Sequence, residues 1–204
     1  MRQLHLLLAA LATLSATAAD VQTKGTFVTI RPDSSQTRVI RLQVVTDNII
    51  RVQATCEDEL PHKAPSLIIV EQTQKPSFTV EESPLAVSVK AKNVTATVNR
   101  HSGALTFLDA QGDVLLSEER KTFKPHRVAP REIGSGTPSK QQLNGWTWHI
   151  TFHSPADEAF YGLGQHQSEE LNLKGKNEDL FQYNTKVSVP FVVSNKNYGL
   201  LWDS

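Results

Sequence analysis

Three pairs of neighbouring acidic residues are the first place to look for acid–base chemistry. The pairs are Asp157-Glu158, Glu169-Glu170 and Glu178-Asp179. A general acid and a general base need surroundings that push their pKa values apart, usually an apolar pocket for one of them. Each pair consists of sequence neighbours in polar loop sequence, where we expect no apolar pocket that would raise one pKa above the other. We therefore expect all six side chains to face solvent, and the sequence predicts no catalytic residue among them.

The glycines of Gly162-Leu163-Gly164 suggest the start of a dinucleotide-binding fingerprint. The third glycine of that fingerprint would fall at position 167, which is Gln167, and no helical pattern follows. We interpret the two glycines instead as residues that let the backbone turn sharply and lie close to a neighbouring surface.

His149 and His153 have a spacing that would suit a metal site on a helix. The residues around them alternate as in a strand, where four residues span ~13 Å, so the two rings cannot share one ion. The sequence also has no Gly-x-Ser-x-Gly motif, no phosphate-binding loop and no cluster of Cys and His at metal spacing. It predicts no metal site and no cofactor.

The segment from Gln165 to Asp179 is the strongest candidate for binding. It follows Phe160 and Tyr161, which we expect to end a strand, and it projects as a loop rich in polar side chains such as His166. Gln, His, Asn and Tyr offer hydrogen bonds and flat apolar faces without net charge. That chemistry suits a sugar, whose hydroxyls take donors and acceptors while its C–H face stacks on an aromatic ring.

The elements that must hold this loop are strands. Apolar and polar residues alternate over 39–45 and 50–54, with Thr46-Asp47-Asn48 as the turn of a hairpin. The same period recurs over 85–90, over 94–99 and on both sides of the turn at 109–112, and no apolar stripe has helical spacing. The sequence predicts an all-β chain folded as an antiparallel β-sandwich.

The second half of the chain contains a connection and three further strands. Three prolines and the run Gly134-Ser135-Gly136 indicate that 120–145 is an irregular connection across one end of the sandwich. In the strand that follows, Trp146 and Trp148 lie on the apolar face, so we expect them to serve the core. After the loop we expect two more strands, with Pro190 at the start of the first.

The N-terminus and the charge balance limit where the chain works and what it binds. Residues 1–19 have the layout of a cleaved signal peptide, so we expect a secreted or periplasmic domain at 20–204. Cys56 is the only cysteine, which excludes an internal disulfide. Lys and Arg total 21 and Asp and Glu total 21, so the chain has no electrostatic reason to bind nucleic acid or a membrane surface.

A resemblance to a known family emerges from the C-terminal third. The runs AFYGLGQHQ, LNLKGK and LFQYNTKVSVPFVVSNKNYGLLWDS resemble the N-terminal region of glycoside hydrolase family 31, the retaining α-glycosidases, in its α-xylosidase and α-glucosidase branch. The resemblance implies a galactose-mutarotase-like supersandwich whose projecting loop, at about 165–179, leans over the active site of a following (β/α)8 barrel. The resemblance places Asn184, Thr185, Tyr183 and Gln165 at the substrate pocket. The polar chemistry of the loop adds His166 to these candidates for substrate binding. Many relatives carry Asp and Glu where this chain has Asn184 and Gln165.

The family's two catalytic aspartates belong to the barrel, for which this chain is too short because a barrel needs about 250 residues. We therefore expect a sandwich incomplete at its C-terminus, which serves as an accessory domain or fragment of a glycosidase whose catalytic barrel lies outside this chain. Its partner would be an oligosaccharide or polysaccharide with α-xyloside or α-glucoside linkages.

Two alternatives are a free-standing carbohydrate-binding module and a structural domain that only packs on a catalytic partner. The module would use Tyr161, Tyr183, Trp146 and Trp148 as an aromatic platform.

Overall fold

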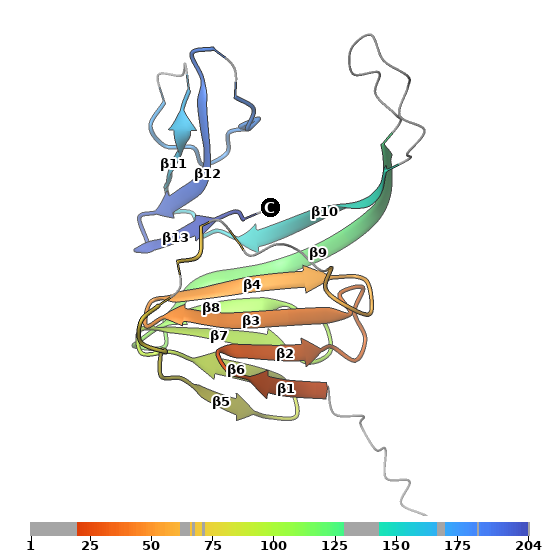
Figure 1. Cartoon of the computed structure of the whole chain (residues 1–204). Helices are drawn as coiled ribbons and strands as arrows, with labels where there is room; N and C mark the ends of the chain where they lie inside the picture. Colours follow the sequence, from red (N-terminus) through yellow and green to blue (C-terminus); the bar gives the residue numbers. More distant parts are fainter. Residues whose placement is uncertain are drawn as a thin grey trace, which may run out of the picture.

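β-Strands form the regular structure of the chain in the part that the structure describes (Figure 1). The computed structural model describes residues 20–61, 66, 68–70, 72–128, 143–166, 170–182 and 184–203. Residues 1–19, the expected signal peptide, and Tyr183 lie outside these ranges. Within the ranges, no helix has the length and apolar character needed to cross a membrane. The strands pair antiparallel in three sheets, which confirms the predicted fold class.

The first sheet has four strands in sequence order. They are β1 (Asp20–Lys24), β2 (Phe27–Arg31), β3 (Val39–Thr46) and β4 (Ile49–Thr55). β3 and β4 form the predicted hairpin, with Asp47 and Asn48 in the turn. The amide N–H of Asn48 donates to the Thr46 hydroxyl at 3.2 Å, which supports the turn locally.

The second sheet has six strands in the order β10-β9-β8-β7-β6-β5. Its strands are β5 (Thr79–Glu82), β6 (Ala86–Lys90), β7 (Val94–Asn99), β8 (Leu105–Asp109), β9 (Val114–Val128) and β10 (Leu143–His153). The predicted strands over 85–90 and 94–99 and the turn at 109–112 are confirmed.

The core lies between these two sheets, which are stacked face to face (Figure 1). Alternate residues of each strand point inward, because successive side chains of a strand face opposite ways. Each of the two sheets contributes five fully buried side chains to the core. Those of the first sheet are Val28, Ile30, Ile40, Leu42 and Val44. Those of the second sheet are Val87, Val89, Ala96, Val98 and Leu105. The antiparallel sandwich is therefore the stable scaffold of the chain.

β9 corrects the prediction of an irregular connection from residue 120 onward. Residues 120–128 continue β9 and pair with β10, so only 129–142 fall outside the described strands. Pro125 is tolerated because β8 pairs with β9 only as far as Ser117, which leaves one edge of β9 free. The Phe123 amide points to that free side, where it donates to Gln36 Oε1 at 3.4 Å, and Pro125 shares this orientation two residues later.

The third sheet stands apart from the sandwich and carries the predicted binding segment (Figure 1). Its strands are β11 (Phe160–Gln165), β12 (Val187–Ser194) and β13 (Tyr198–Leu201). Phe160 and Tyr161 begin β11, so the expectation that they end a strand was wrong. Pro190 lies inside β12, so the prediction that it starts this strand was wrong. It lies opposite the register shift between Gly162 and Gly164 of β11. The regular hydrogen-bond ladder between β11 and β12 is interrupted there, so the missing N–H of proline removes no ladder bond.

The two tryptophans of β10 do not fill the core, and one of them, Trp148, connects the third sheet to the sandwich. Trp146 is 45% exposed and Trp148 is 42% exposed, so the expectation that they serve the core was wrong for this chain. Trp148 stacks on Trp202 with 4.3 Å between ring centroids, and Arg51 of β4 pairs with Asp203 at 2.7 Å. Both contacts use residues that directly follow β13, so they hold this end of the third sheet against the other two.

Candidate functional site

Two glycines set the spacing between β11 and β12. Gly162 and Gly164 have φ values of 113° and 103°, which L side chains rarely adopt. A Cβ atom at Gly162 would lie 2.6 Å from the Phe191 carbonyl oxygen, and one at Gly164 would lie 1.9 Å from the Val187 carbonyl oxygen. The interpretation that these glycines permit close backbone approach is confirmed, and the approach determines where the end of β11 lies.

The predicted sugar-binding residues gather at one end of the β11–β12 pair. Gln165 is the last residue of β11 and pairs with Val187, the first residue of β12. Asn184 and Thr185 precede Val187 by three and two residues, so they lie near the same end of the strand pair. All three side chains belong to exposed residues, and Asn184 has a φ of 35°, a left-handed conformation that Asn tolerates better than most residues. Sugar binding by these residues stays a prediction.

His166 is placed differently from its predicted neighbours. Its side chain is only 7% exposed, and Nε2 donates to the Leu163 carbonyl at 2.8 Å. Nδ1 lies 3.7 Å from Glu178 Oε2, and among the described residues it has no hydrogen-bond partner. In this arrangement His166 links the end of β11 to the returning part of the loop. Its contact with a sugar stays a prediction.

Asn172 fastens the base of the projecting loop to β11. Its Oδ1 atom accepts hydrogen bonds from the amides of Phe160 at 3.1 Å and Lys174 at 3.0 Å. The Leu173 amide donates to the Phe160 carbonyl at 2.8 Å. Two of these hydrogen bonds therefore hold the loop at the start of β11, and the third closes a turn within the loop.

Glu158 lies two residues before β11, and its surroundings differ from the prediction. It was expected to face solvent with the other acidic residues, yet it is only 3% exposed. Its Oε1 atom accepts hydrogen bonds from the Ser194 hydroxyl at 2.6 Å and the Tyr198 hydroxyl at 2.7 Å. These donors explain how the chain buries a carboxylate without a large energetic penalty. The pairing could not be read from the sequence, because the partners lie 36 and 40 residues away.

The hydrogen bonds decide the protonation of this buried pair. Burial is the largest single effect and acts to raise the pKa of Glu158. Hydrogen bonds, first those from Ser194 and Tyr198, together with the charge of Lys174 outweigh it and hold that pKa below its usual value. Burial and the neighbouring Glu158 carboxylate both raise the pKa of Tyr198. At neutral pH Glu158 is therefore an anion and Tyr198 a phenol that donates to it.

The remaining acidic residues divide by exposure. Asp157, Glu170 and Asp179 are exposed as predicted, whereas Glu178 is half-buried beside His166, and Glu169 lies outside the described residues. The pKa of Asp157 is lowered by its hydrogen bond and charge interaction with Lys196.

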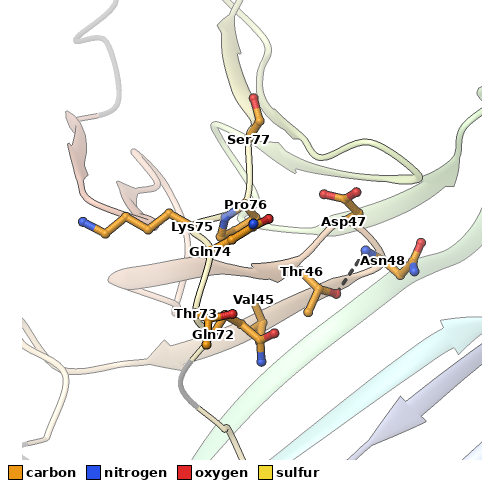
Figure 2. Close-up of a pocket in the computed structure, with 10 residues that line it drawn as sticks. All are labelled: Val45, Thr46, Asp47, Asn48, Gln72, Thr73, Gln74, Lys75, Pro76 and Ser77. Atoms are coloured by element: carbon orange, nitrogen blue, oxygen red, sulfur yellow. Dashed lines mark hydrogen bonds between the residues drawn. The ribbon is translucent and has the colours of Figure 1, made fainter.

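Two hollows of the described surface lie away from the predicted sugar-binding residues. One of about 360 Å³ lies between the β3–β4 turn and residues 72–77 (Figure 2). Its ionisable side chains are Asp47 and Lys75, and no aromatic ring lines it. The other, of about 210 Å³, contains a buried pair in which Lys121 Nζ lies 2.9 Å from Glu118 Oε2. Neither has the aromatic and polar lining of a sugar pocket.

No group of three or more His, Cys, Asp or Glu side chains within the described ranges could hold a metal ion.

The family of the chain follows from comparison with known proteins. The model of the glycosyl hydrolase 31 N-terminal galactose mutarotase-like domain matches residues 39–204. The chain belongs to this family, as its resemblance implied.

The relatives and solved structures that the chain resembles include glycosidases. A family 31 glucosidase of Pseudescherichia vulneris is 30% identical over 188 residues, covering 82% of this chain and 33% of the relative. An α-xylosidase of Saccharolobus solfataricus is 25% identical over 181 residues, covering 81% of this chain and 22% of the relative. The crystal structure of the α-xylosidase from Xanthomonas citri is 36% identical, with a TM-score of 0.74, and the match covers 90% of this chain and 19% of that one. The chain therefore spans a third or less of the length of these proteins.

Replacing Gly164 by Ala should separate β11 from β12. The added Cβ would meet the Val187 carbonyl, and a left-handed φ adds roughly 1–3 kcal/mol of backbone strain for a non-glycine residue. We expect the amides of β12 to exchange with solvent at least about 10-fold faster, as measured by NMR. Gly145→Ala, whose Cβ meets nothing within 4 Å, is the control and should leave exchange in the third sheet unchanged.

Replacing Glu158 by Gln should lower stability in a pH-dependent way. Because the folded pKa is depressed, the carboxylate stabilises the fold above its unfolded pKa of about 4.3, and this contribution is lost as pH falls through the folded value. Urea titration should show a loss of about 1–3 kcal/mol at pH 7 that shrinks below pH 4. Glu59→Gln, at an exposed position after β4, is the control. A loss for Glu158→Gln that is the same at both pH values would contradict this assignment.

Proposed function

We propose that the chain is the N-terminal accessory domain of a secreted retaining α-glycosidase that acts on α-xylosides or α-glucosides. Its role is to supply part of the wall of the substrate pocket while another domain performs hydrolysis. The observation that carries this proposal is the gathering of Gln165, Asn184 and Thr185 at one end of a sheet that projects from the sandwich.

The outer face of β12 supports a catalytic partner in the same protein. Four apolar side chains on this face are between 39% and 46% exposed, namely Val187, Val189, Phe191 and Val193. Contiguous exposed apolar surface marks a place where another surface binds. A catalytic barrel packed here would stand beside the end of β11 and bring its two aspartates to the same sugar.

The polar groups at this end of the sheet suit a neutral substrate. The amides of Gln165 and Asn184 and the hydroxyl of Thr185 can donate to and accept from sugar hydroxyls without supplying charge. Relatives include enzymes described as α-xylosidases, and one structure of a soil-metagenome α-xylosidase contains xylose. These comparisons support an α-xyloside or a related α-glucoside as the substrate, and the zero net charge gives no support for nucleic acid.

The hydrolytic step itself is assigned to the partner domain. Hydrolysis with retention needs two carboxyl groups roughly 5 to 5.5 Å apart on either side of the glycosidic bond, one as nucleophile and one as acid and base. Glu158, the buried carboxylate at the base of the third sheet, is occupied by two hydroxyl donors. The residues at the end of β11 therefore bind and orient, and no cofactor is needed for chemistry of this kind.

Export through the signal peptide at 1–19 belongs to the same proposal. A small-residue site at Ala18-Ala19 precedes Asp20, where β1 begins.

The exposed tryptophans favour one second candidate, a carbohydrate-binding module. Trp146, Trp148 and Tyr161 are each more than 40% exposed, and Trp146 Nε1 donates to Glu57 Oε1 at 3.0 Å, which fixes the ring. Calorimetry of the isolated chain with xyloglucan oligosaccharides separates the two functions. We expect millimolar binding or none from an accessory domain, because its pocket is completed elsewhere. Micromolar binding that Trp146→Ala abolishes would establish the module instead.

Removing the Asn184 amide should weaken substrate binding in the glycosidase that carries this domain. Asn184→Gly is the appropriate change because glycine keeps the left-handed backbone without strain. Loss of one or two hydrogen bonds to the sugar should lower kcat/KM on an aryl α-xyloside about 10-fold, mainly through KM.

Asn197→Gly is the matched control for this experiment. Asn197 has a φ of 63° and lies in the β12–β13 turn, so its replacement tests the same backbone change at another position of the third sheet. Unchanged kinetics for both variants would show that the surface only packs on its partner.

A further inference from the structure

The segment 154–160, which connects β10 to β11, is bonded to two other parts of the chain. On one side lies the β12–β13 turn at 194–198, and on the other lies the loop at 170–177. Because one short segment holds both, its position determines how the loop stands relative to the sheet.

Asn195 binds the segment to the β12–β13 turn through three hydrogen bonds. The Ala159 amide donates to Asn195 Oδ1 at 2.8 Å, and the Asn195 amide donates to the Ala159 carbonyl at 3.1 Å. Asn195 Nδ2 donates to the Asp157 carbonyl at 3.0 Å. This pattern satisfies both backbone groups of Ala159 and leaves them little freedom to shift.

Lys174 and Asn172 bind the same segment to the loop. Lys174 Nζ donates to the Pro155 carbonyl, and Asn172 holds the Phe160 amide as described above. The Pro155 carbonyl also accepts the Glu158 amide at 3.0 Å, which closes a turn from 155 to 158. The lysine of the loop therefore attaches to the same turn that carries the Glu158 carboxylate.

The Glu158 carboxylate lies where these contacts meet. Its side chain points into the sheet and takes the hydroxyls of Ser194 and Tyr198, and Ser194 is itself buried. Ser194 Oγ also accepts from the Lys196 amide at 3.1 Å, so the turn is bonded internally as well. A buried anion held by charge-assisted hydrogen bonds resists displacement more than an exposed pair does.

We propose that Glu158, with Ser194 and Tyr198, is a positioning element for the projecting loop. It fixes the segment 154–160, to which Asn172, Leu173 and Lys174 are bonded. From there the loop returns to the sugar-binding end of the sheet, where Glu178 Oε2 lies 3.7 Å from His166 Nδ1. Glu158 touches no substrate in this role. The proposal rests on the proposed function for its consequence in catalysis, but its structural part can be tested in this chain alone.

Hydrogen exchange in the 204-residue chain tests the structural part. In Glu158→Gln, the Leu173 and Lys176 amides should exchange at least about 10-fold faster, because the segment that holds the loop is no longer fixed. The amides of Val89 and Val98, in the core strands β6 and β7, should exchange as in the unaltered chain. Asp157→Asn is the matched control, since it changes an exposed carboxylate of the same segment.

Two results of this exchange experiment would overturn the proposal. One is unaltered exchange at Leu173 in a folded Glu158→Gln chain. The other is an equal acceleration at Leu173 and Val89, which would show a general loss of stability without any specific positioning. If Glu158→Gln does not fold, Tyr198→Phe removes one donor while keeping the carboxylate and the ring, and the same comparison applies to it.

Kinetics of the longer glycosidase test the consequence for catalysis. Glu158→Gln should raise KM for an aryl α-xyloside about 3- to 10-fold with a smaller change in kcat, and Asp157→Asn should change neither. An effect of Asn184→Gly without any effect of Glu158→Gln would overturn the positioning role and keep the proposed function. If neither variant alters KM, the proposed function fails, even where exchange shows that Glu158 holds the loop.

Discussion

A carboxylate that is removed from water must be hydrogen-bonded, and the whole third sheet is arranged around that requirement at Glu158. Ser194 and Tyr198 supply the two donors, one from the end of β12 and one from the start of β13. Satisfying one anion therefore joins the entry to β11 with the turn between the next two strands. Any displacement of that entry would leave a buried charge with fewer partners, which is costly enough to keep it in place.

Different interactions stabilise the sandwich and the third sheet. Apolar side chains from both large sheets close the sandwich, whereas the third sheet is held by polar bonds around Glu158 and by the Trp148–Trp202 and Arg51–Asp203 contacts at its other end. Because polar anchors secure the third sheet, its apolar residues on β12 need not pack on the sandwich. They are exposed in this chain. That exposure is what the proposed accessory role requires.

Strands with one buried face were predictable from the sequence, because burial enforces a period of two at positions such as Ile40, Leu42 and Val44. The extension of β9 beyond residue 120 was not predictable, because a proline such as Pro125 normally indicates the end of a strand. Pro125 is tolerated only because this edge of β9 is not paired with β8. The assignment of Gln165 and Asn184 to a sugar site comes from the family resemblance, and it stays a prediction. The Glu158 cluster escaped prediction because its hydroxyl partners carry no periodic signal, and tertiary structure alone brings them together.

We propose that the face of β12 formed by Val187, Val189, Phe191 and Val193 is covered by a catalytic domain that completes the sugar site next to Gln165. Hydroxyl-radical footprinting of Phe191, which is 39% exposed in this chain, tests it most directly. The account predicts that Phe191 is oxidised in the isolated chain and strongly protected in the longer glycosidase, while Leu85, at 77% exposure on the sandwich, reacts equally in both. Equal oxidation of Phe191 in the two proteins would contradict it.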